Sequence, residues 1–205
     1  ALPICALMHQ GHDVVCFLRK PVRTKANTTQ ASLSKALQGT EIRYGDPCRL
    51  ESLRQDAFCQ QPFDAVVSCL ASRTGTPQDA WAVDHQAHLY ALEAAKEVGV
   101  HHFVLLSAIC VQKPLLAFQK AKLAFEAALI ESGLRYAIVR PTAFFKSLAG
   151  QLERVKKGKP FLIFGNGQLT ACKPISDDDL GDFIASCLTD PSKRNQILPI
   201  GGPGP

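Results

Sequence analysis

The sequence has no apolar run long enough to cross a bilayer. The longest, HFVLLSAICV, covers only residues 102–111, whereas a transmembrane helix needs about 20 apolar residues. The pattern of a signal peptide, with a charged start, an apolar middle and a small-residue cleavage site, is also missing. Lys and Arg are scattered rather than clustered, and the formal net charge is only +5. These absences argue against a membrane span and a nucleic-acid partner, and weakly favour a small anionic ligand.

Cysteine patterns that bind zinc or carry out redox chemistry are absent too, although the chain has eight cysteines. No C-x-x-C motif occurs, and no group of Cys and His has the spacing of a metal site. Cys16, Cys69, Cys110 and Cys187 fall inside apolar strands and helices. We therefore expect buried free thiols in a reducing compartment rather than disulfides, and no metal site.

What the sequence does have is a regular alternation of apolar strands and amphipathic helices. The predicted strands are 12–20, 40–46, 63–72, 102–107, 136–141 and 196–202, with a hairpin over 160–172. The predicted helices are 1–11, 31–39, 49–58, 79–99, 108–133, 142–158 and 175–188. Because the strands are apolar throughout, both of their faces should be buried, which indicates a parallel sheet between two layers of helices. The prediction is an α/β, Rossmann-like doubly wound fold.

A Gly-rich turn between a first strand and a first helix, which holds the pyrophosphate of a dinucleotide, is not present. The segment Gly165-Asn166-Gly167 has neither the third glycine nor a following helix. Because Ala1 already falls in a predicted helix, we expect an internal piece of a longer protein, without the first strand and its Gly-rich loop. Residues 1–205 should form a single, partial NAD(P)-binding domain, in which 142–205 contribute to the substrate side.

Ligands of doubly wound sheets bind beyond the carboxyl ends of the strands. Arg19 ends the first predicted strand, where an Arg favours the 2′-phosphate of NADP and an acid would favour NAD; a solvated strand end is the alternative. Asp46 ends the next strand and could accept a hydrogen bond from the adenine amine, or serve only as a turn residue before Pro47. The third predicted strand ends in Leu70, Ala71 and Ser72. The small side chains of Ala71 and Ser72 would let the backbone approach a cofactor closely; an ordinary turn is the alternative.

Ser107 and Lys122 match the short-chain dehydrogenase pattern. In that pattern the Ser polarises the reacting group, and the Lys binds the nicotinamide ribose and lowers the pKa of a Tyr one turn earlier. Phe118 occupies the position of this Tyr, four residues before Lys122 and on the same helix face. Alternatively, Phe118 is a core residue and Lys122 extends its ammonium group to the surface.

The end of the fifth predicted strand supplies the remaining residues that could contact the cofactor or the substrate. The backbone of Pro141 and Thr142 should border the nicotinamide carboxamide. Phe144 and Phe145 could stack on a flat apolar substrate, although at least one of them is as readily explained as a core residue.

Long runs of the sequence resemble one family, the NADPH-dependent divinyl chlorophyllide a 8-vinyl reductases. These are atypical short-chain dehydrogenases related to the NmrA-like and isoflavone-reductase-like proteins. The runs are VVSCLASRTG, HFVLLSAICVQKPLLAFQKAKLAFEA, YAIVRPTAFFKSLAG, VKKGKPF, CKPIS and QILPIGGPG. The resemblance implies NADPH as cofactor and a tetrapyrrole substrate. It also implies residence in the chloroplast, in the stroma or at a thylakoid or envelope surface, or in the cytoplasm if the source is a cyanobacterium.

A vinyl group has no oxygen for a Tyr to protonate. We therefore expect the hydride to add to the outer vinyl carbon, with the charge spread through the macrocycle and Phe118 serving as an apolar wall. The side chains that could pair with the substrate's propionate are Lys113, Lys146, Lys156 and Lys157. Two alternatives stay open. One is an NmrA-type sensor that binds NADP without turning it over, and the other is an isoflavone-reductase-like enzyme with a smaller substrate.

Overall fold

The computed structural model describes residues 2–19, 37–163, 166 and 173–202. The predicted helix at 31–39 and the predicted hairpin at 160–172 lie for the larger part outside these residues.

The described strands are all parallel and form two ladders. They are β1 (Val15–Arg19), β2 (Glu41–Gly45), β3 (Ala65–Ser68), β4 (His102–Leu106), β5 (Arg135–Pro141) and β6 (Gln196–Ile200). One ladder has the order β1-β2, and the other has the order β3-β4-β5-β6. The central strand β4 is buried along almost its whole length, whereas β3 is only half-buried over most of its residues. The parallel α/β prediction is therefore confirmed, with the strands divided between two ladders.

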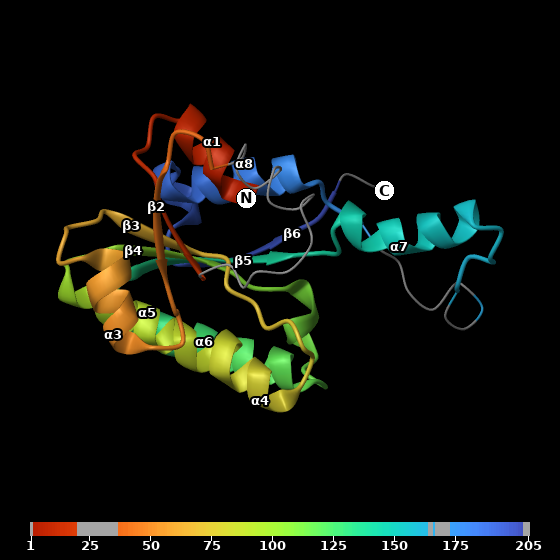
Figure 1. Ribbon diagram of the computed structural model, residues 1–205, viewed down its shortest axis with the longest axis horizontal. Helices are drawn as coiled ribbons and strands as arrows, with labels where there is room; N and C mark the ends of the chain where they lie inside the picture. The colour runs from red at the N-terminus through yellow and green to blue at the C-terminus, as the bar shows by residue number, and fades with distance from the viewer. Residues whose placement is uncertain (1, 20–36, 164–165, 167–172, 203–205) are drawn as a thin grey trace.

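Helices cover both faces of the strands (Figure 1). The helices are α1 (Leu2–His9), α3 (Leu50–Ser52), α4 (Pro77–Ala80), α5 (His88–Glu97), α6 (Ala117–Glu131), α7 (Phe145–Lys156) and α8 (Asp177–Thr189). Two π-helical segments, η1 (Leu53–Phe58) and η2 (Trp81–Ala87), and two 3₁₀ turns, η3 (Ile109–Gln112) and η4 (Pro191–Lys193), complete the elements. In Figure 1, α1 and α8 lie on one face, α3 to α6 lie on the other, and α7 extends away from the body.

Alternate residues of the central strands feed two apolar layers, as the two-residue period of a strand requires. Val104 and Val139 pack toward α8, in a cluster that includes Leu180 and Ile184. Phe103, Leu105 and Ile138 pack toward α5 and α6, in a cluster built from Leu92, Phe125 and Leu129. The central strands β4 and β5 are covered on both faces, whereas β2 and β6 are largely exposed, so the prediction that both faces of every strand are buried was wrong for these two.

The predicted free thiols are confirmed for the seven cysteines that the structure describes, but the prediction of burial was partly wrong. Cys16 and Cys187 are buried in their elements, whereas Cys69 and Cys110 are exposed. Each exposed thiol follows the end of its strand, β3 or β4, where the chain leaves the apolar layer. Within the described part of the chain, no helix has the length and apolar character needed to span a membrane.

Candidate cofactor and substrate site

Lys122 projects from α6 into the protein interior and forms a buried ion pair. Its Nζ lies 3.1 Å from Oδ1 of Asp84, and the side chains are 9% and 1% exposed. A charged side chain on a buried helix face needs a partner, because an unpaired charge in the interior is costly. The ammonium group therefore does not extend to the surface, which was the alternative interpretation of Lys122.

Asp84 also binds the loop after β3. Ser72 Oγ donates a hydrogen bond of 2.5 Å to Asp84 Oδ2, and the backbone N of Ser72 lies 3.4 Å from Oδ1. One carboxylate thus connects Lys122 and Ser72, two residues that the sequence singled out for cofactor binding. Asp84 was not singled out from the sequence, although a carboxylate on the buried face of an amphipathic helix must have a partner.

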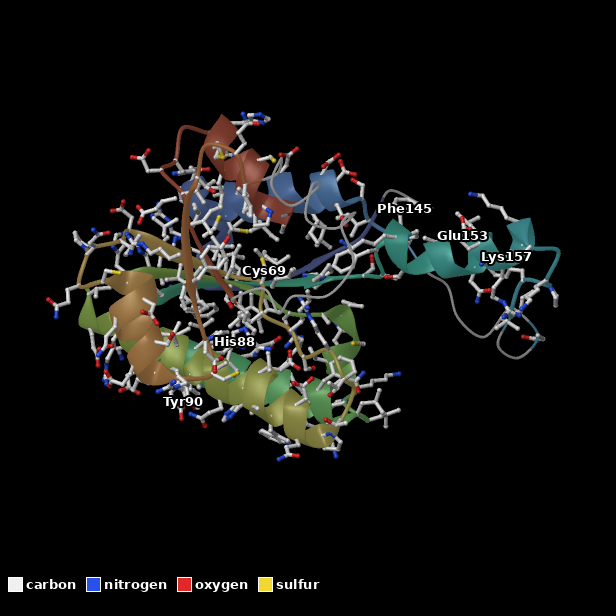
Figure 2. All side chains as sticks on the ribbon, viewed as in Figure 1. Cys69, His88, Tyr90, Phe145, Glu153 and Lys157 are labelled. Carbon is white, nitrogen blue, oxygen red and sulfur yellow. The ribbon has the colours of Figure 1, made fainter. Side chains whose placement is uncertain are left out.

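His88 lies on the same helical run, four residues after Asp84, and is fully buried (Figure 2). Its Nδ1 lies 2.9 Å from the carbonyl oxygen of Val83, and its ring packs against Phe125 with centroids 4.7 Å apart. Burial, and after it the positive charge of Lys122, lowers the pKa of His88 to about 4. The imidazole is therefore neutral at physiological pH, and Asp84 remains the counter-ion of Lys122.

Ser107 follows β4 and is buried against a second charged pair. Its Oγ donates a hydrogen bond of 2.5 Å to Oε1 of Glu126. Arg140 binds the same carboxylate through Nε, 3.2 Å from Oε1, and through an ion pair of Nη2 with Oε2. Glu126 lies one helical turn after Lys122 on α6. The sequence predicted Ser107, but it did not identify Glu126 or Arg140.

Phe118 lies in the first turn of α6, four residues before Lys122, and is half-buried. Gln119 rather than Phe118 organises this helix start, because its Oε1 accepts hydrogen bonds of 2.8 Å from the backbone N of Leu115 and of Leu116. The phenyl ring supplies neither a donor nor an acceptor at the position where the dehydrogenase pattern has a Tyr hydroxyl.

A cavity of about 510 Å³ lies at the carboxyl ends of β1 and β2. Arg19 and Arg49 both contribute to its lining, and Arg19 Nη2 donates to Cys48 Sγ at 3.1 Å. Two guanidinium groups at one cavity suit a phosphate, which they bind through charge-assisted hydrogen bonds. The carboxylates of Asp46 and Asp56 also line the cavity, so its charge is mixed, and only the guanidinium groups suit the phosphorylated ribose of a nucleotide. Arg49 was not singled out from the sequence.

Asp46 lines the same cavity but also has a structural role. Its Oδ1 accepts a hydrogen bond of 3.0 Å from the backbone N of Cys48, so that it stabilises the turn after β2. Gly45 is fixed by packing rather than by a ligand, because a Cβ there would lie 2.4 Å from Ser52 Oγ and 2.6 Å from Cζ of Phe17. The predicted contact of Asp46 with adenine stays a prediction.

The two halves of the site lie at the same edge of the strands. The pKa of Asp79, at the start of α4, is lowered first by the backbone N–H groups of Thr74 and Arg73 and, more weakly, by Arg19. Asp79 accepts hydrogen bonds of 2.9 Å from the backbone N of Arg73 and of Thr74, in the loop that follows β3. A doubly wound sheet binds its ligand beyond the carboxyl ends of its strands, where this loop and Arg19 both lie.

The residues after β5 divide between core and surface. Pro141 is buried at the end of the strand, and Thr142 Oγ1 donates a hydrogen bond of 2.5 Å to the carbonyl oxygen of Lys173. Phe144 packs against the α8 cluster and therefore behaves as a core residue. Phe145 is 56% exposed. Figure 2 shows it at the start of the projecting helix α7.

The four lysines considered for the substrate's propionate differ in their pairing. Lys146 Nζ lies 2.7 Å from Oδ2 of Asp177, and Lys156 Nζ lies 3.0 Å from Oε1 of Glu153. Within the described residues, the structure shows no ion pair for Lys113 or Lys157, and both are exposed. Lys113 and Lys157 are thus the two of these four lysines without an ion pair among the described residues.

The sequence is similar to those of two curated plant proteins over nearly its whole length. The chain is 50% identical over 204 residues to the chloroplastic divinyl chlorophyllide a 8-vinyl-reductase of Cucumis sativus, covering 97% of this chain and 49% of the relative. It is 49% identical over 203 residues to the protein of the same name in Oryza sativa subsp. indica, covering 97% of this chain and 50% of the relative. The chain thus spans about half the length of the curated relatives it matches.

The fold is also that of solved nicotinamide-nucleotide enzymes. The triphenylmethane reductase of Citrobacter sp., complexed with NADP(H), superimposes with a TM-score of 0.74 at 17% identity, over 100% of this chain and 66% of that chain. At such low identity the likeness establishes the fold alone. The protein-family model described as NAD(P)H-binding matches residues 4–191, which is most of the sequence. The chain therefore belongs to the NAD(P)H-binding family.

Proposed function

We propose that the natural protein containing this chain reduces the 8-vinyl group of divinyl chlorophyllide a, or of a related divinyl tetrapyrrole, to an ethyl group with NADPH. The observation that carries the proposal is the 50% identity to a chloroplastic 8-vinyl-reductase over 97% of this chain. Because the relatives are named chloroplastic, we place the protein in the chloroplast, in the stroma or at a membrane surface.

NADPH fits the residues present. Arg19 and Arg49 would bind the 2′-phosphate at the cavity beyond β1 and β2, where Asp46 would meet the adenine. Backbone of Leu70, Ala71 and Ser72 would border the cofactor beyond β3. This assignment of NADPH rather than NADH is supported by two guanidinium groups at one cavity.

Lys122 would bind the nicotinamide ribose through its ammonium group, which Asp84 holds in place. Because Asp84 also binds Ser72, the position of the lysine is coupled to the loop that would contact the cofactor. Pro141 and Thr142 would border the carboxamide. NADPH supplies the hydride, and these residues of the chain fix the distance between donor and acceptor, which is the main source of rate acceleration available here.

Reduction needs one hydride and one proton. The outer vinyl carbon accepts the hydride, the former π electrons move onto the inner carbon and into the conjugated ring, and a proton from water completes the ethyl group. Charge spread over a macrocycle needs no positioned phenol, so Phe118 suffices as an apolar wall. Phe145, exposed at the start of α7, would stack on the ring. Lys113 or Lys157 would pair with the propionate.

The test uses the complete natural polypeptide with divinyl chlorophyllide a and NADPH. We expect an absorption change of the pigment together with NADPH oxidation. Lys122→Ala should weaken NADPH binding by about tenfold or more, because a hydrogen bond to a charged group contributes about 1.5–3 kcal/mol. Lys120→Ala, on the exposed face of the same helix, is the matched control and should change little.

A sensor that binds NADP without turnover would bind NADPH normally and leave the pigment unchanged. An enzyme for a smaller substrate would oxidise NADPH only with that substrate. Either result, or unaltered NADPH affinity in Lys122→Ala, would contradict the proposal.

A further inference from the structure

The hydroxyl proton of Ser107 is already used in a hydrogen bond to Glu126. Ser107 is 5% exposed and Glu126 is 2% exposed, so the hydrogen bond between them lies in the protein interior. Arg140 contacts both oxygens of the Glu126 carboxylate. An ionised carboxylate only accepts hydrogen bonds, and a hydroxyl has a single proton. The direction of the Ser107–Glu126 bond is therefore fixed: Ser107 donates, and only its lone pairs remain for a ligand.

A carbonyl substrate needs the opposite arrangement. When hydride adds to a C=O group, negative charge develops on its oxygen, and donors must face that oxygen. At this site Phe118 has no donor and Ser107 offers lone pairs. A vinyl group has no such oxygen, so the lack of a hydrogen-bond donor does not slow hydride transfer to it.

We propose that the Glu126–Arg140 pair is a specificity determinant that fixes Ser107 as a hydrogen-bond acceptor and so restricts the site to conjugated C=C substrates over C=O substrates. In this role Glu126 is a positioning residue, because it acts through Ser107. The inference rests on the proposed function, since it assumes that the reacting group of a tetrapyrrole lies beside Ser107.

A single substitution at Glu126 should reverse the direction of its hydrogen bond with Ser107. In Glu126→Gln, an amide oxygen at the position of Oε2 would keep the hydrogen bond of Arg140 Nη2, which places the amide nitrogen at the position of Oε1, facing Ser107 and Arg140 Nε. That nitrogen donates to Ser107 Oγ and leaves the hydroxyl proton of Ser107 free for a ligand. Ser107→Ala combined with Glu126→Gln removes the hydroxyl altogether and is the matched control.

The probe is a tetrapyrrole that carries a formyl group in place of the 8-vinyl group, bound to the complete polypeptide with NADP⁺. The measurement is the C=O stretching frequency by resonance Raman spectroscopy. We expect no hydrogen-bond shift in the wild type, a shift to lower frequency in Glu126→Gln, and loss of that shift in the double variant.

Turnover with NADPH gives a second measurement. The wild type should reduce the formyl compound with a kcat/KM at least about a hundredfold below that for the vinyl compound, as expected when an oxyanion lacks a donor. The formyl-to-vinyl ratio should rise about tenfold or more in Glu126→Gln. If that variant fails to fold, the two wild-type measurements still test the inference.

A hydrogen-bonded formyl group in the wild type, or equal reduction of both compounds, would overturn the inference and leave the vinyl reductase proposal intact. So would a folded Glu126→Gln variant with an unchanged spectrum and ratio. Wild-type protein that neither binds nor reduces either pigment would instead overturn the proposed function, and this inference with it.

Discussion

Two buried carboxylates, Asp84 and Glu126, organise the polar groups of the site. Each is less than one-twentieth exposed, and each has one cationic partner and one serine hydroxyl. Buried ion pairs add little net stability, but removing one partner costs about 3–5 kcal/mol because it leaves an isolated buried charge. Their value lies in positioning: Asp84 holds Lys122 through an ion pair, and Glu126 holds Ser107 through a hydrogen bond.

The sequence could predict Lys122 and Ser107 because their types and spacing match a known pattern, but it could not predict their partners. Asp84 and Lys122 are brought together only when the helical run of α4, η2 and α5 packs against α6. An ion pair between two helices depends on how the helices pack, which neither the helical periodicity of the sequence nor a short sequence motif reveals. The available signal was indirect: a charged residue within an apolar helix face needs a counter-ion.

His88 makes the stability of the fold depend on pH. Its pKa is lowered to about 4 in the folded protein, chiefly by burial and secondly by Lys122, and is about 6.5 when unfolded. The unfolded state therefore binds more protons between these values, and stability falls as the pH falls. We expect a loss of about 2 kcal/mol between about pH 7 and about pH 5 from this residue.

Urea denaturation at the two pH values checks this prediction, with His88→Leu as the variant and the exposed His101→Gln as control. His88→Leu should show a smaller pH dependence than the wild type, and His101→Gln should not. Part of the wild-type dependence should persist in His88→Leu, because burial lowers the pKa of His102 in the same way. Equal pH dependence in wild type and His88→Leu would contradict the assignment.

At the scale of elements, the predicted strands appear near their expected places because continuous apolar runs between turn residues allow few alternatives. The predicted helix at 79–99 is instead a run of α4, η2 and α5 with a π-helical centre. A π segment shifts the hydrogen-bond register by one residue, which helical periodicity does not reveal. Asp84 lies in this segment, in keeping with the tendency of π-helical turns to occur at functional sites.

The start of α8 lies two residues after the predicted one and can be tested by one substitution. Ser176 Oγ accepts a hydrogen bond of 3.0 Å from the backbone N of Asp179, as an N-cap should. Ser176→Ala should lower the free energy of unfolding by about 1 kcal/mol. Ser147→Ala, on the exposed face of α7, should change it by less than about 0.5 kcal/mol. Chemical denaturation distinguishes the two, and equal effects would argue against the cap.

At the scale of the whole molecule, the carboxyl ends of the strands collect the polar groups and the helices cover the apolar faces. One half of this edge presents guanidinium groups at a cavity, and the other presents an ammonium group held by a carboxylate. The division suits a ligand with a phosphorylated end and a reactive end. The helix α7 extends from this body with exposed apolar side chains, among them Phe145, Leu152 and Val155. This surface is the part of the chain where we place the macrocycle.

In the proposed reaction, the conjugated ring, rather than a protein hydroxyl, takes up the charge of the reduction. The most direct measurement is the position of deuterium in the product after reaction with NADPH deuterated at the transferred position. We predict that deuterium appears in the methyl group of the new ethyl side chain, with a proton from solvent on the carbon next to the ring. Deuterium on the carbon next to the ring, or a product without deuterium, would contradict the account.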